Sequence, residues 1–167
     1  MVILTLPFPF RPANAMLATE MRARRACVKL VDFSLCARLG PEGTVQTCGT
    51  TSYMPPEMTL RRPHTLSCDI WSLGIVAAAL LAGGPTPNDH CRFDALFFPA
   101  IGEKPSIKGE GADFVSACLE LDPAKRPSAA ELLEHPWLKT AASNDEMWRL
   151  VKTVFARSAV ANVIGMI

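Results

Sequence analysis

The sequence predicts a mainly α-helical domain with one minor β element. Three observations support this fold class: apolar residues recur at helical spacing, two Ser-x-x-Glu capping boxes mark helix starts, and one short run has strand character. Of the 167 residues, 49% are hydrophobic and 20% are charged. A chain of this length and composition can bury a substantial core, so we expect it to be globular.

Strand character is confined to residues 28–33, "VKLVDF", an apolar run that ends at Asp32. Residues 35–65 are rich in Gly, Pro and Thr, and they predict one long loop. Residues 69–81 then predict a helix, with Asp69 near its N-terminus, where a carboxylate suits the helix dipole.

The second half of the chain predicts further helices. Residues 83–109 show no clear periodicity and are expected to be irregular, with a short helix around 93–98. Apolar residues at helical spacing predict a helix over 112–121. Ser128 with Glu131 forms a capping box that opens a helix through residue 134.

Ser143 with Glu146 repeats the capping box and predicts a last, amphipathic helix within residues 140–167. The apolar face of this helix is expected to consist of Met147, Leu150, Val151, Val154 and Phe155.

Composition excludes several classes of partner and site. A formal net charge of +1 gives no basic surface for nucleic acid. The six cysteines form no C-x-x-C pair, so we expect neither a metal site nor a disulfide framework, and we predict an intracellular, cytoplasmic protein. The longest apolar stretch, residues 70–84, is shorter than the roughly 20 residues of a membrane span.

Asp32 is the first candidate functional residue. It ends a strand at the mouth of a long loop, where a carboxylate can hold Mg²⁺ and the ion can bind phosphate oxygens. An Asp at the end of a strand can equally be a turn or cap residue.

Four motifs in order resemble the C-terminal (large) lobe of a eukaryotic Ser/Thr protein kinase. They are "VKLVDFS" (28–34), "GTTSYMPPE" (49–57), "DIWSLG" (69–74) and "LDPAKRPSAAELLEHPWL" (121–138). The resemblance implies a partial kinase domain over residues 1–139, followed by the helical tail over 140–167.

The resemblance assigns Asp32 to the Mg²⁺-binding Asp of the Asp-Phe-Gly motif, with Ser34 in the place of the Gly. Residues 55–57 take the place of the Ala-Pro-Glu that ends the activation segment. By the same resemblance, Glu57 would form a buried ion pair with Arg126 beneath the substrate-docking loop. The alternative is that these are two unrelated, solvated charges.

Three further positions gain roles from the resemblance. Asp69 would accept backbone N–H bonds from the catalytic loop, and Trp71 would lie in the core. Thr50 matches the threonine that faces the catalytic base in Ser/Thr kinases.

Residues 11–17, "RPANAML", resemble the Lys-Pro-Glu-Asn-Ile-Leu-Leu stretch of the catalytic loop. Asn14 would then be a second Mg²⁺ ligand, or alternatively a turn residue, and Arg11 would contact the transferring phosphate. The position of the catalytic base is occupied by Pro9, which cannot accept a proton. Loss of a general base typically lowers the rate by about 10²- to 10⁴-fold.

The resemblance implies Mg-ATP as cofactor and a protein as substrate or regulatory partner. No Gly-rich loop, Val-Ala-Ile-Lys strand or Glu-bearing helix of the small lobe is found in this sequence, so we expect the chain to be inactive by itself. The alternative is a pseudokinase that serves as a regulatory docking module.

The tail offers one more hypothesis. Trp148 and Phe155 are seven residues apart on an amphipathic, partly basic segment, as in calmodulin-binding helices of some kinases. The alternative is that this helix simply docks on the lobe.

Overall fold

The computed structural model describes residues 4–5, 10–20, 22–34, 36–40, 42–83 and 107–163. The chain divides into two compact units. The first consists of Met1–Asn14 with Asp32–Lys139, and the second of Ala15–Val31 with Thr140–Ile167. Among the residues described, each helix is too short or too polar to cross a bilayer.

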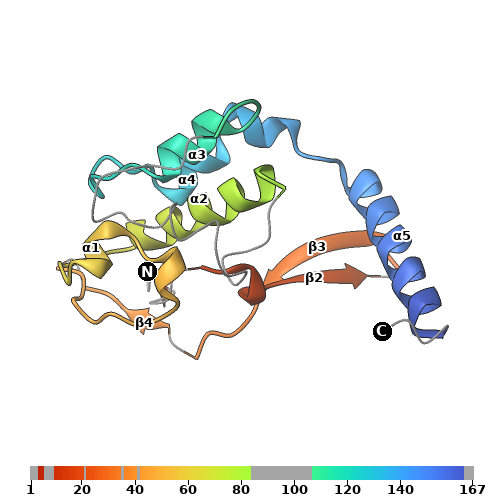
Figure 1. The fold of residues 1–167 in the computed structure, drawn as a ribbon, viewed down its shortest axis with the longest axis horizontal. Coiled ribbons are helices and arrows are strands. Elements are labelled where there is room, and N and C mark those ends of the chain that lie inside the picture. The colour runs from red at the N-terminus through yellow and green to blue at the C-terminus, as the bar shows by residue number, and fades with distance from the viewer. Residues whose placement is uncertain are drawn as a thin grey trace. The chain divides into compact units, whose positions relative to one another are not determined.

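The first unit is mainly helical (Figure 1). Its helices are, in chain order, η1 (Pro12–Asn14), η2 (Thr51–Tyr53), α1 (Pro56–Thr59), α2 (Ser67–Leu81), α3 (Ala112–Cys118), α4 (Ala129–Leu133) and η4 (Pro136–Thr140). A small antiparallel sheet joins β1 (Leu4–Thr5) to β4 (Ala37–Arg38). The prediction of a mainly helical fold with minor β structure is confirmed for this unit.

Helix α2 is the centre of the core and lies beside α3 (Figure 1). Ten of its 15 residues are buried, so nearly its whole circumference is covered by protein. The remaining core side chains come from η2, α3 and α4; they are Tyr53, Phe114, Val115, Cys118, Leu119 and Leu132. The predicted core position of Trp71 is confirmed, because this residue is 2% exposed.

Gly74 allows α2 to approach α3 closely. A Cβ at this position would lie 2.6 Å from Cβ of Cys118 and 2.9 Å from Cδ2 of Leu119. Overpacking of this kind typically costs about 1–3 kcal/mol, and a Cβ cannot rotate away from its neighbours. This cost exceeds the roughly 1 kcal/mol by which alanine favours a helix over glycine.

We therefore expect Gly74→Ala to lower the free energy of unfolding by about 1–2 kcal/mol in urea denaturation. Gly40→Ala is the matched control, because a Cβ at Gly40 would meet no atom within 4 Å. A Gly74→Ala protein as stable as the native chain would show that α2 and α3 are not packed as described.

The expected long loop over residues 35–65 is wrong in part, because it contains β4, η2 and α1. Tertiary packing stabilises these short elements: Met58 of α1 is fully buried, and Pro56 occupies the first turn of α1, where a proline is tolerated. Helix α3 is also shorter than predicted and ends at Cys118. The predicted irregular region and the short helix within it fall largely on residues 84–106, outside the described residues.

Both predicted capping boxes are confirmed. The Ser128 hydroxyl accepts from the Glu131 N–H at 3.3 Å, and the Glu131 carboxylate accepts from the Ser128 N–H at 2.7 Å. Ser143 and Glu146 make the same pair of bonds at 3.3 and 2.8 Å. Hydrogen bonds from the serine side chains lower the pKa of both glutamates, so the caps form at neutral pH and are lost as the carboxylates protonate in acid.

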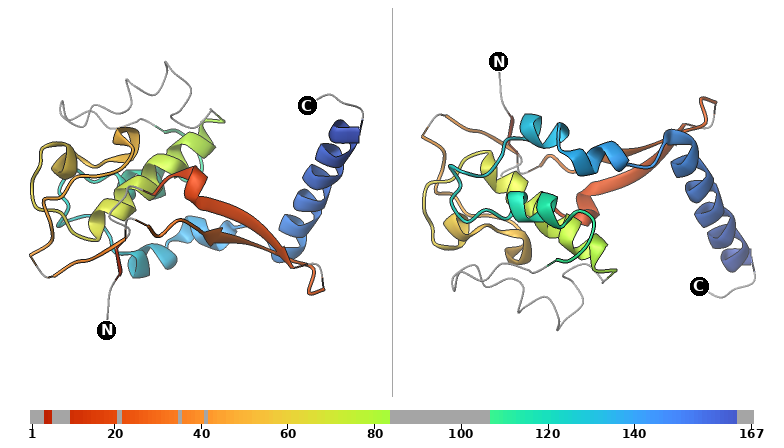
Figure 2. Two further views of the ribbon diagram at one scale, coloured as in Figure 1. Left: turned by 90° about the horizontal axis from the view of Figure 1, so that it is seen from below. Right: turned by 90° about the horizontal axis from the view of Figure 1, so that it is seen from above.

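The second unit is a hairpin with one helix (Figure 2). Strands β2 (Ala15–Glu20) and β3 (Arg25–Leu30) pair antiparallel, and α5 (Asn144–Val163) packs against β3. The Asn144 side chain fixes the start of α5 to the hairpin. Its amide donates to the Arg24 carbonyl at 3.1 Å and accepts from the Ala26 N–H at 3.3 Å.

The predicted strand lies three residues earlier than expected, as β3, and Val28 of this strand is 63% exposed. A two-stranded hairpin does not bury every apolar position that its sequence offers. On α5, Val151 is 2% exposed, whereas Leu150 and Val154 are 60% and 63% exposed, so the predicted apolar face is covered only in part.

Candidate functional site

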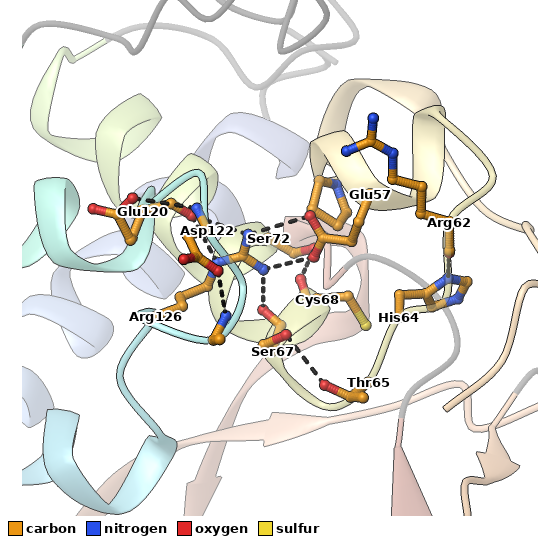
Figure 3. A network of polar contacts seen from close by, with 12 residues as sticks. Glu57, Arg62, His64, Thr65, Ser67, Cys68, Ser72, Glu120, Asp122 and Arg126 are labelled. Atoms are coloured by element: carbon orange, nitrogen blue, oxygen red, sulfur yellow. Dashed lines mark hydrogen bonds and ion pairs between the residues drawn. The ribbon is translucent and has the colours of Figure 1, made fainter. Parts of the chain in front are cut away.

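Glu57 and Arg126 form a buried, bidentate ion pair (Figure 3). Nη1 of Arg126 lies 2.8 Å from Oε1 of Glu57, and Nη2 lies 3.3 Å from Oε2. The two residues are 5% and 6% exposed. The contact predicted from the sequence is therefore present, and the alternative of two solvated charges does not apply.

Arg126 also binds two backbone carbonyls. Nη1 donates to the Ser67 carbonyl at 2.7 Å, and Nε and Nη2 donate to the Glu120 carbonyl at 3.1 and 3.0 Å. The guanidinium carbon lies 5.2 Å from the centre of the Trp71 ring, within the range of a cation–π contact. All five N–H groups of the guanidinium thus have an acceptor, which is what a buried charge requires.

Ser72 links α2 to the segment that precedes α1. Its hydroxyl is fully buried, 2.9 Å from the Tyr53 carbonyl and 3.0 Å from the Cys68 carbonyl. Tyr53 is itself 2% exposed, and burial raises its pKa to about 12. The segment of residues 49–57 is thus held on α2 at Tyr53 and on Arg126 at Glu57.

A second anchor lies between Thr44 and His64. The two residues exchange backbone hydrogen bonds of 3.0 and 2.9 Å, and the buried His64 ring lies with Nδ1 3.2 Å from the Arg62 carbonyl. Gly43, with φ of +71°, faces the His64 carbonyl, where a Cβ would lie only 2.3 Å from the oxygen. Neither Ser72 nor His64 was predicted from the sequence. The position of Ser72 within "DIWSLG" could have indicated it, whereas no motif contains His64.

The Asp32 carboxylate accepts hydrogen bonds from its neighbour Ser34. Oδ1 of Asp32 accepts from the Ser34 hydroxyl at 2.6 Å and from the Ser34 N–H at 3.4 Å. These bonds, with a smaller contribution from the positive charge of Arg11, lower the pKa of Asp32. Asp32 is exposed and has φ of +64°, in the left-handed region.

The Asn14 side chain also forms a hydrogen bond within the chain. It is 8% exposed at the end of η1, and its Oδ1 accepts from Nε of Arg11 at 3.2 Å. The structure thus brings Arg11 and Asn14 into direct contact.

The residues predicted to bind Mg²⁺ each have one side-chain oxygen hydrogen-bonded to an internal donor, which reduces the oxygen ligands left for a hard cation. Their role as Mg²⁺ ligands stays a prediction. Among the residues that the structure describes, no group of three or more His, Cys, Asp or Glu side chains is placed to hold a metal.

The remaining predicted site residues are placed as follows. Thr50 is half-buried at the start of η2, where its carbonyl accepts from the Tyr53 N–H at 3.1 Å. Asp69 is half-buried in the first turn of α2. Pro9 lies outside the described residues, so the relation of Thr50 to the base position stays a prediction.

The calmodulin-binding role of the tail likewise stays a prediction. Trp148 is half-buried in α5.

Comparison with known proteins gives the same assignment as the motifs. The family model described as "Protein kinase domain" matches residues 10–138. The chain is 34% identical over 149 residues to the probable serine/threonine-protein kinase mkcE of Dictyostelium discoideum, a match that covers 83% of this chain and 21% of that protein.

The chain is likewise 34% identical over 142 residues to the serine/threonine-protein kinase pak-1 of Caenorhabditis elegans, covering 80% of this chain and 24% of that protein. It therefore spans between a fifth and a quarter of the length of these relatives. By the family match and these identities, the chain belongs to the protein kinase family.

Proposed function

We propose that this chain is a large-lobe docking module of the Ser/Thr kinase type, which binds a protein substrate or regulatory protein but does not itself transfer phosphate. The observation that carries the proposal is the buried pair between Glu57 and Arg126. This pair fixes residues 49–57, here called the docking loop, in place.

A fixed loop favours binding because less conformational entropy is lost when a partner docks on it. The docking loop is held at Tyr53 by the Ser72 hydroxyl and at Glu57 by Arg126. Thr51 lies between Thr50 and the anchor at Tyr53. Its side chain is exposed, so a partner can contact it. Bound protein segments would then meet a preformed surface.

Phosphate transfer by this chain is disfavoured by two features of its residues. Pro9, at the position of the catalytic base, has no group that can take a proton from a substrate hydroxyl. Kinases of this family generally use Mg-ATP, but one carboxylate oxygen of Asp32 and the amide oxygen of Asn14 already accept internal hydrogen bonds.

A second candidate function is phosphoryl transfer by a longer protein that contains this segment. It is favoured by the relatives, which are named as Ser/Thr kinases and of which this chain spans only a part. In that case Asp32 and Asn14 would bind Mg-ATP, Arg11 would contact the transferring phosphate, and Thr50 would face the base position.

Transfer of labelled phosphate from Mg-ATP to a generic basic protein tests the catalytic half of the proposal. We expect the chain to transfer no more label than its Asp32→Asn variant. Transfer by the native chain that the variant lacks would establish the second candidate instead.

Binding to a library of Ser- and Thr-containing peptides, followed by fluorescence polarisation, tests docking. We expect saturable binding that Thr51→Glu weakens, because residue 51 is exposed on the docking loop. Thr19→Glu is the matched control, since Thr19 is exposed on β2 of the other unit. If no peptide binds saturably, or if both variants weaken binding equally, the docking loop is not the binding surface.

A further inference from the structure

We propose that Ser34 and Arg11 together close the Asp32–Asn14 pair to divalent cations, with the Arg11 guanidinium serving as an internal cation in their place. The inference deepens the proposed function and rests on its assignment of Asp32 and Asn14 to the cation-binding positions.

The Ser34 hydroxyl competes directly for the Asp32 carboxylate. Its oxygen lies 2.6 Å from Oδ1, the short distance typical of a hydrogen bond from a hydroxyl to a charged carboxylate. Such bonds are about twice as strong as bonds between neutral groups. The Ser34 N–H adds a longer contact of 3.4 Å to the same oxygen. A cation that binds Oδ1 must share this oxygen with the hydroxyl, which weakens the oxygen as a ligand, whereas a glycine at residue 34 would offer no such competitor.

Arg11 occupies the other candidate ligand. Its Nε donates to Oδ1 of Asn14 at 3.2 Å, and Oδ1 is the only side-chain oxygen of an asparagine. Asn14 is 8% exposed, so little of its side chain is open to water.

The charge of Arg11 opposes a second cation. The guanidinium binds the side-chain oxygen of Asn14 directly, so it places a positive charge at one of the two candidate ligands. Two positive charges within a Debye length of about 8–10 Å repel each other. A phosphate group that reached this site would therefore meet Arg11 rather than a metal ion.

Manganese broadening in NMR spectra tests the inference on the full chain. Mn²⁺ takes the same oxygen ligands as Mg²⁺, and its paramagnetism broadens nearby amide signals even when binding is weak. We expect the Phe33 amide of the native chain to broaden no more than in the Asp32→Asn variant. In the double variant Ser34→Ala/Arg11→Gln, the same amide should broaden about tenfold more at equal Mn²⁺, because the Ser34 hydroxyl and the Arg11 charge no longer compete for the ligands.

Ser116→Ala is the matched control, since Ser116 is an exposed serine on α3, and its spectrum should respond like that of the native chain. Broadening of native Phe33 above the Asp32→Asn level would show that the site is open to cations. A double variant that broadens no more than the native chain would show that Ser34 and Arg11 are not what closes it. If the native chain transfers phosphate while its Phe33 amide signal stays sharp in the presence of Mn²⁺, the proposed function is wrong. The present inference would still hold in that case.

Discussion

Replacing Arg126 with alanine should lower the free energy of unfolding by about 3–5 kcal/mol, a large part of the roughly 5–15 kcal/mol that stabilises a typical domain. The change leaves the Glu57 carboxylate buried without its cation, and it removes the donors that the Ser67 and Glu120 carbonyls now bind. For a chain of this length, 1 kcal/mol corresponds to about 2–4 °C in Tm, so we expect a loss of roughly 6–20 °C.

Calorimetry or thermal circular dichroism would measure this loss, and Lys125→Ala provides the control at the neighbouring residue. The Lys125 side chain is 76% exposed and its contact with Asp122 is 3.7 Å long, so its removal should cost no more than about 1 kcal/mol. A drop of under a few degrees for Arg126→Ala would mean that the buried pair is not formed in solution.

Replacing both partners by apolar residues separates the cost of an unpaired charge from the value of the pair. Glu57→Leu/Arg126→Met should be more stable than Arg126→Ala, because it buries no uncompensated carboxylate. It should remain less stable than the native chain, because the Ser67 and Glu120 carbonyls still lose their donor.

Replacing Leu119 with alanine should lower the free energy of unfolding by about 2–5 kcal/mol. Leu119 is 1% exposed at the end of α3, and its side chain meets α2 beside Gly74. Truncation removes apolar contacts on both helices and leaves a cavity between them, which close-packed neighbours fill only in part.

Urea denaturation would measure this change, with Leu133→Ala as the control. Leu133 belongs to α4 and is 71% exposed, so its truncation removes little buried surface and should change stability by less than about 0.5 kcal/mol. Equal losses for the two leucines would contradict the placement of Leu119 in the core.

Two kinds of feature were predictable from the sequence: those determined by neighbouring residues and those implied by the resemblance to kinases. Helix α2 was predicted from its continuous apolar run, and both capping boxes from a serine three residues before a glutamate. The pairing of Glu57 with Arg126, 69 residues apart, was not available from local pattern and came only from the resemblance to kinases.

Features that depend on tertiary packing were missed. The strand β2 has no strong local signal, and it forms because β3 supplies its hydrogen-bonding partner. Likewise η2 and α1 are too short to be stable alone, and they exist because Tyr53 and Met58 are buried. The bond from Ser34 to Asp32 depends on a left-handed backbone at Asp32, which a sequence pattern does not specify.

The bonds of Arg126 join residues 57, 67 and 120 to residue 126, across as many as 69 positions of the chain. Contacts between such distant positions must overcome the entropy of closing a long loop. During synthesis the docking loop leaves the ribosome well before Arg126 does. A nascent chain therefore cannot present the finished loop to a partner until Arg126 has also emerged.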